Sequence, residues 1–284
     1  MTLAVPLPSG FAAWETGQPY SADPPSVSFT PGSSSSKGSW YQLESGLSAE
    51  GFGLTVFWAY VWAGAQAHNF LAEIGMDPAG GISYSVLVTD FILDKAYNHS
   101  YTPLGVINAT YLPLRIPSGA SLAMRAEDSY SSAPATGDAQ CIVGQKRSAP
   151  QAERFGVHTE SIGIAGSSKG TAITLGTSGS WGDWVSLGAT SKDLWYFDVR
   201  AGLDLDTINT RAVWVQLAVG DGSSYHVIRE RSYRSTTWEE AASQYDRPVG
   251  NYPVKAGSTL YARGTTSVGS ADAGWHVAAI GVGG

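Results

Sequence analysis

Three pairs of acidic residues could do catalytic or metal chemistry. Asp204 and Asp206 are separated by one residue, so both carboxylates point to the same side of a strand or turn. Such a pair could bind calcium or act as a general acid and base. The alternative interpretation is a solvated loop, and the first half of the chain has no equivalent Asp pair. The other acidic pairs are weaker candidates: Glu239 with Glu240, and Asp90 with Asp94.

Histidine and cysteine give no pattern typical of a metal or nucleophile site. His226 and His276 fall in predicted strands and could lie near each other, but the five histidines lack metal-ligand spacing. The single Cys141 excludes an internal disulfide and a Cys-based zinc site, and its apolar neighbours favour a small buried residue. The sequence contains no P-loop and no dinucleotide fingerprint. We therefore predict no enzyme activity and no cofactor, with Asp204 and Asp206 as weak metal candidates.

Composition excludes several classes of partner. The net charge is −7, and Lys and Arg form no cluster of the kind that neutralises nucleic-acid phosphates. The longest apolar run, residues 52–65, is shorter than the roughly 20 residues that a membrane helix requires, so we expect no membrane insertion. The N-terminus lacks a signal-peptide pattern, which predicts that the chain is made in a cytoplasm and stays or assembles there.

Aromatic residues on one predicted strand are the better functional lead. Trp58, Tyr60 and Trp62 share one face of the strand, and the apolar residues at 57, 59 and 61 share the other. A sandwich strand normally buries one face, so the second needs cover, most simply from another subunit. The aromatic face could instead fill the core or stack on sugar rings.

The elements that would position these residues belong to an internal repeat. Pro113-Leu114-Arg115 followed by Gly119-Ala120-Ser121-Leu122-Ala123-Met124-Arg125 resembles Pro253-Val254-Lys255 followed by Gly257-Ser258-Thr259-Leu260-Tyr261-Ala262-Arg263. Further segments match in the same order: 27–29 with 173–175, 38–43 with 182–187, 71–75 with 216–220, and 141–144 with 277–281. The repeat predicts a duplicated domain of about 130 residues.

The matched basic residues of this repeat are candidate contact residues. Arg115 with Lys255, and Arg125 with Arg263, could be exposed edge charges that prevent wrong strand pairing. They could instead form specific salt bridges in an assembly, and neither interpretation implies catalysis.

Many short alternating segments separated by Gly, Pro and Asp turns predict an all-β fold. We predict two tandem, duplicated antiparallel β-sandwich domains of jelly-roll type, with a polar surface turn of helix at Thr237–Gln244. Prolines in the first 25 residues predict an extended arm that lies on a neighbour. The predicted boundaries are 1–25 for the arm, 26–145 for the first domain, 146–156 for the linker and 157–284 for the second domain.

The repeated pattern resembles structural proteins of tailed-bacteriophage virions. It combines Gly-Ser-Trp-x-x-Leu, an apolar strand, Ile-Gly-x-Asp and the run Leu-Pro-Leu-Arg-Ile-Pro-Ser-Gly-Ala-Ser-Leu-Ala-Met-Arg, and it covers residues 38–144 and 182–281. The second copy is two residues shorter before its Gly and lacks the second Pro. The resemblance implies a jelly-roll-like unit but no position on the particle, which could be head decoration, spike, neck, fibre or tail tip.

From the repeat and the resemblance we expect a structural component of a bacteriophage particle, assembled in the host cytoplasm. Its partners would be other virion proteins and copies of itself, in a homo-oligomer. The first alternative is a carbohydrate- or receptor-binding protein of the virion that contacts a host surface glycan. The second is a glycan-degrading enzyme, which would need paired carboxylates that face one cleft.

Overall fold

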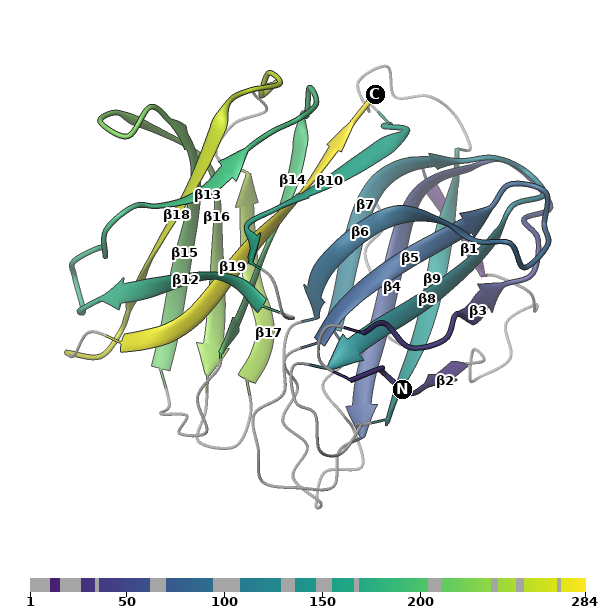
Figure 1. The fold of residues 1–284 in the computed structure, drawn as a ribbon, viewed down its shortest axis with the longest axis horizontal. Helices are drawn as coiled ribbons and strands as arrows, with labels where there is room; N and C mark the ends of the chain where they lie inside the picture. Colours follow the sequence, from purple (N-terminus) through teal and green to yellow (C-terminus); the bar gives the residue numbers. More distant parts are fainter. Residues whose placement is uncertain are drawn as a thin grey trace.

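The computed structural model describes residues 11–15, 27–33, 36–61, 70–93, 108–128, 136–146, 155–165, 169–203, 211–235, 240–248, 253–269 and 272–284. These residues contain nineteen strands and no helix, as the composition predicts (Figure 1). No helix within them is long and apolar enough to cross a membrane. We call residues 11–146 the first half and residues 155–284 the second half.

The first half consists of two antiparallel sheets. One has the order β1–β9–β4–β7, with β2 also paired to β9, and comprises β1 (Phe11–Glu15), β2 (Val27–Phe29), β4 (Gly51–Val61), β7 (Asn108–Ile116) and β9 (Thr136–Lys146). The other has the order β3–β8–β5–β6 and comprises β3 (Tyr41–Glu44), β5 (Phe70–Asp77), β6 (Ser85–Leu93) and β8 (Ser121–Asp128).

This strand order is that of a jelly roll. If β1 and β2 together count as the first strand in chain order, one sheet contains strands 1-8-3-6 and the other 2-7-4-5. Two Greek keys wound into two facing sheets give this order. The first half therefore agrees with the predicted sandwich in both fold class and connectivity.

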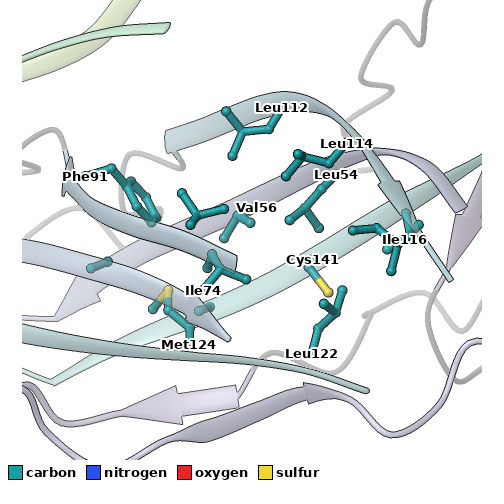
Figure 2. Close-up of a cluster of buried hydrophobic side chains, with 14 of the residues drawn as sticks. Leu54, Val56, Ile74, Phe91, Leu112, Leu114, Ile116, Leu122, Met124 and Cys141 are labelled. Carbon is teal, nitrogen blue, oxygen red and sulfur yellow. The ribbon is translucent and has the colours of Figure 1, made fainter. Parts of the chain in front are cut away.

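The core of the first half lies between the two sheets (Figure 2). Leu54 and Val56 point inward from β4 and are at most 1% exposed. Ile74 and Met124 come from the opposite sheet and are completely buried. Alternate residues of each strand thus supply the core, as a period of two requires.

The second half has the same two layers with one change of pairing. The first layer contains β10 (His158–Ile162), β12 (Lys169–Gly176), β14 (Tyr196–Leu203) and β19 (Asp272–Gly283), with β11 (Ile164–Ala165) paired to β12. The second contains β13 (Val185–Ala189), β18 (Thr259–Thr266), β15 (Arg211–Gly220), β16 (Tyr225–Ser235) and β17 (Glu240–Pro248) in that order. The end of β12 pairs with β18 and joins the layers.

The sixth strand of each half has a different partner. In the first half β7 pairs with β4, whereas in the second half β17 pairs with β16 and extends the opposite layer. This pairing also corrects the predicted helix at Thr237–Gln244, because residues 240–244 lie in a strand of the sheet. Local sequence favoured a helical turn there, but cross-strand pairing decides the conformation.

The register gives residues of the two halves matching neighbours. Glu73 stands opposite Arg125, Gln216 opposite Arg263, Met76 opposite Leu122 and Val219 opposite Leu260. Leu122 and Leu260 are both completely buried. These correspondences agree with the predicted repeat, but the changed partner of β17 shows that the two halves are not exact copies. A common origin of the halves stays a prediction.

Residues 1–25 are predicted to form an extended arm that lies on a neighbour, but the described part of this segment pairs within the first half. Residues 11–15 form β1, which pairs antiparallel with residues 142–146 of β9 in the same half. The prolines of the segment flank this strand rather than interrupt it, so the backbone N–H groups of β1 remain able to pair. Phe155 and Gly156, which were expected in the linker, already contact the folded chain, and Gly156 bridges to Leu114.

The two halves pack side by side, with β6 and β7 of the first half against β10, β14 and β19 of the second (Figure 1). Ile280 and Val282 of β19 are nearly fully buried and belong to the same apolar cluster as the core of the first half. Trp195 and Tyr196 pack against that cluster. The outer face of β14 and β19 is therefore covered by the other half and not by water.

Candidate binding site on the outer face of the second half

Four aromatic rings and one arginine gather on the outer face of β13, β18, β15 and β16. The guanidinium carbon of Arg263 lies 4.3 Å from the ring centroid of Trp184 and 4.9 Å from that of Trp181. Trp184 is stacked on Tyr225 with centroids 4.9 Å apart, and Tyr225 meets Tyr261 edge-on at 5.0 Å. All five side chains are half-buried, so this group, the Arg263 cluster, presents rings and a cation to solvent.

Strand pairing produces the Arg263 cluster. Arg263 and Tyr261 are two residues apart on β18, so both point outward while Leu260 and Ala262 enter the core. Trp184 immediately precedes β13, which pairs with β18 beside Arg263. The turn residue Gly179 has a φ of 83°, a conformation that glycine adopts without strain, and this turn leads into Trp181.

A row of polar side chains crosses the sheet beside these rings. Arg263 Nε donates to Gln216 Oε1 at 2.9 Å, and Gln216 Nε2 donates to Glu230 Oε2 at 2.8 Å. Glu230 thereby orients the amide of Gln216 so that its oxygen faces the guanidinium. No carboxylate in the described ranges forms an ion pair with Arg263.

The first half has a related arrangement of an arginine on aromatic rings, but there the arginine forms an ion pair within its own sheet. Arg125 lies over Trp40 at 4.3 Å, and Trp40 packs against Tyr84 with centroids 5.7 Å apart. Arg125 Nε and Nη2 both donate to Glu73 Oε2, at 2.7 Å and 2.6 Å. The charge of this arginine is therefore met by a carboxylate of its own sheet, at the position where the second half has Gln216.

Electrostatics differ accordingly between the two arginines. Partial burial lowers the pKa of the Arg263 guanidinium, because the charged form loses hydration. An arginine remains protonated at neutral pH despite such a shift. The Arg263 cluster thus holds a positive charge that is partly desolvated and is met only by a neutral amide and aromatic faces among the described residues.

The four predicted contact residues of the repeat form two kinds of interaction. Arg115 Nε donates to Glu50 at 2.5 Å, and Lys255 Nζ lies 2.6 Å from Asp193. Both pairs are exposed, and such pairs contribute little stability. Arg125 and Arg263 instead lie on aromatic rings, as described above.

The structure describes the remaining predicted site residues only in part. Asp204, Asp206, Trp62 and Glu239 lie outside the described residues, and for Trp58 and Tyr60 only the backbone in β4 is described. Leu54 and Val56, which precede them on the same strand, point into the core. His226 and His276 lie on strands that do not pair with each other, and His276 Nδ1 donates to Gly170 O at 2.9 Å.

The described part of the chain contains no cluster of metal-binding side chains, and its cysteine is buried. No group of three or more His, Cys, Asp or Glu side chains there could hold a metal ion. Cys141 is completely buried in the core of the first half, as expected, and burial raises the pKa of its thiol. The thiolate that a nucleophile requires is therefore disfavoured.

A buried charged cluster was not predicted from the sequence, because its residues alternate on a strand like surface residues. Asp198 Oδ2 accepts from Arg200 Nε at 2.8 Å, and Asp198 Oδ1 accepts from Arg231 Nη1 at 2.5 Å. Arg200 Nη2 donates to Thr110 Oγ1 of the first half. The three charged residues are 1–5% exposed, so this cluster joins the halves rather than forming an accessible site.

Comparisons with known proteins define no family. No family model matches the chain, and no curated protein matches it. Among solved structures the chain is similar to PNGF-II, with a TM-score of 0.36 and 9% identity. The match covers 86% of this chain and 59% of the PNGF-II chain, so the chain spans less than two thirds of that protein. A likeness at this level does not bear on function. The fold and the site define an all-β sandwich protein with a half-exposed arginine–aromatic face.

Proposed function

We propose that the chain is a structural component of a bacteriophage particle and acts through subunit assembly. The observation that supports this most is the jelly-roll order of the first half, β1–β9–β4–β7 facing β3–β8–β5–β6. Jelly rolls recur in virus capsid proteins and in lectins, so the fold suits a structural or a binding role. The sequence resemblance to virion proteins favours the structural one.

The packing of the two halves also supports an assembly role. Their contact buries apolar residues of β19 and the charged cluster around Asp198. Hydrogen bonds that cross the contact join Thr159 Oγ1 to Leu87 O at 2.7 Å and Tyr196 OH to Tyr111 O at 2.9 Å. A chain held together in this way can present its surfaces in a fixed relation, which repeated contacts in a particle require.

Sedimentation of the purified chain tests this proposal. We expect a concentration-dependent oligomer, because a charged fraction of 14% and an aromatic fraction of 11% suit permanent contacts. A monomer at all concentrations, with no binding to other proteins of the particle, would contradict the proposal.

Sugar binding is the second candidate function, and the Arg263 cluster is the observation that favours it. Half-exposed aromatic rings beside hydrogen-bonding side chains are suited to the apolar face and hydroxyl groups of a pyranose. A glycan array probed with the intact chain tests this candidate, with Tyr261→Ala as the variant expected to lose signal. Equal binding by both proteins would remove the Arg263 cluster from any sugar recognition.

A further inference from the structure

The corresponding sheets of the two halves have different residues opposite the matched arginines, a glutamate in the first half and a glutamine in the second. Glu73 lies opposite Arg125 in β5 and β8, and Gln216 lies opposite Arg263 in β15 and β18. We propose that the Arg263 cluster binds an acidic sugar, whose carboxylate occupies the role that Glu73 has in the first half. This inference rests on the sugar-binding candidate above and names its ligand class.

The first half shows how such an arginine binds a carboxylate. Nε and Nη2 of Arg125 converge on one oxygen of Glu73 at 2.7 Å and 2.6 Å, a charge-assisted contact. In the second half Gln216 accepts only from Nε of Arg263, at 2.9 Å. The terminal nitrogens of Arg263 donate to no carboxylate of the described residues. A ligand carboxylate would supply the acceptors that a planar guanidinium fork accommodates.

Arg263 is positioned before any ligand arrives. Trp181 and Trp184 contact the guanidinium, and Gln216 fixes Nε by a hydrogen bond. Ordering a long side chain costs conformational entropy when it happens on binding. Because these contacts restrict Arg263 in the free protein, less of that cost remains for the ligand to overcome.

The surrounding rings favour a sugar over a simple anion. Tyr225 and Tyr261 are half-buried and lie at the solvent side of the sheet, next to the stacked Trp184. The C–H face of a pyranose can pack on such rings while its carboxylate meets Arg263. A bare anion would use the charge of Arg263 and leave the aromatic surface without a contact.

The probes are methyl β-D-glucuronide, the uncharged methyl β-D-glucoside and acetate, titrated into the intact chain and followed by NMR. We expect the glucuronide to bind about tenfold or more tightly than either control, because a hydrogen-bonded ion pair and ring contacts act together. Equal binding of glucuronide and glucoside would overturn the carboxylate role while sugar binding survived. Equal binding of glucuronide and acetate would overturn the sugar role, and no binding of either sugar would remove both the inference and the sugar-binding candidate.

The sharpest variant is Gln216→Glu, which gives the second half the internal carboxylate of the first. We expect it to weaken glucuronide binding about tenfold or more, because the introduced carboxylate would compete for Arg263 and repel the ligand. That carboxylate would also face Glu230, the present acceptor of Gln216 Nε2, so we expect the same loss in the double variant Gln216→Glu with Glu230→Gln, in which a hydrogen bond between the two side chains can form again. The matched control is Gln42→Glu, which adds the same charge at an exposed position of β3. Arg263→Lys is the second variant, since it keeps the charge but loses the planar fork. Glucuronide affinity that is unchanged in both site variants would overturn the inference.

Discussion

Replacing Asp198 with Asn removes a carboxylate that contacts both Arg200 and Arg231. Asp198 is 3% exposed, and the two arginines are 1% and 5% exposed. Asparagine has nearly the same shape, so the substitution removes charge without opening a cavity. We expect the folded state to lose stability because two buried guanidinium groups then lack this counter-charge.

The magnitude follows from the burial of the group. Breaking a buried ion pair by removing one partner typically costs about 3–5 kcal/mol, whereas an exposed pair contributes about 0–1 kcal/mol. Asp193 provides the control, because its ion pair with Lys255 has side chains that are 53% and 74% exposed. Asp193→Asn removes the same charge from the same half of the chain, so the difference between the variants isolates burial.

Urea denaturation at neutral pH, followed by Trp fluorescence, measures both variants. We expect Asp198→Asn to lower the free energy of unfolding by about 3 kcal/mol or more, with Asp193→Asn within about 1 kcal/mol of the unmodified chain. Equal stability of the two variants would refute the reasoning that Asp198 neutralises buried charge between the halves.

Four further predictions concern other parts of the chain. Cys141 should resist thiol reagents at pH 8 until the chain unfolds, because burial raises its pKa; rapid labelling of the folded chain would contradict this. Deleting residues 1–15 should lower stability by about 1–3 kcal/mol, because β1 pairs with β9, and a melting curve checks it. Backbone N–H groups of Ser224 and Ser223 donate to the Asp221 carboxylate and lower its pKa. The ionised carboxylate therefore stabilises the folded state above about pH 4, and this contribution disappears as the pH falls through the folded pKa. A carboxyl titration by NMR with a midpoint at or above the ordinary value would be the contrary result. Replacing Trp58 and Trp62 with Ser should lower the free energy of unfolding by about 3–5 kcal/mol if their strand face continues the core. Loss of association at an unchanged melting temperature would instead identify a subunit contact. Loss of sugar binding alone would favour the second candidate function.

The fold class was predictable because alternation along a strand is local. The inward phase of Leu54 and Val56 follows from a period of two, and both residues lie in the core. The alternation cannot fix register to better than two residues. Residues 71–75 were matched with 216–220, whereas the structure places Glu73 and Gln216 at the same position opposite their arginines. A shift of two keeps every side chain on its face, so the sequence pattern does not reveal it.

The candidate site was only partly predictable. The repeat identified Arg125 and Arg263, and their shared place in the register agrees with that match. The partners of Arg263 were missed because Gln216 and Glu230 come from other strands and meet it only through pairing. A comparison of the residues opposite each arginine would have found the exchange of Glu for Gln once the register was known.

Contacts between the halves were also beyond local sequence reasoning. Asp198 and Arg200 alternate with apolar residues on β14, a pattern typical of a solvent-exposed face. The other half covers that face, so the charges are buried and paired. Only the tertiary arrangement distinguishes a polar face in water from one in a contact.

Electron cryo-microscopy of virions purified from cells that express this chain tests the proposed particle role most directly, together with mass spectrometry of the same particles. We expect density for the two packed sandwiches at a fixed position that repeats with the symmetry of the particle. Purified, infectious particles that lack the chain would contradict a structural role in the virion.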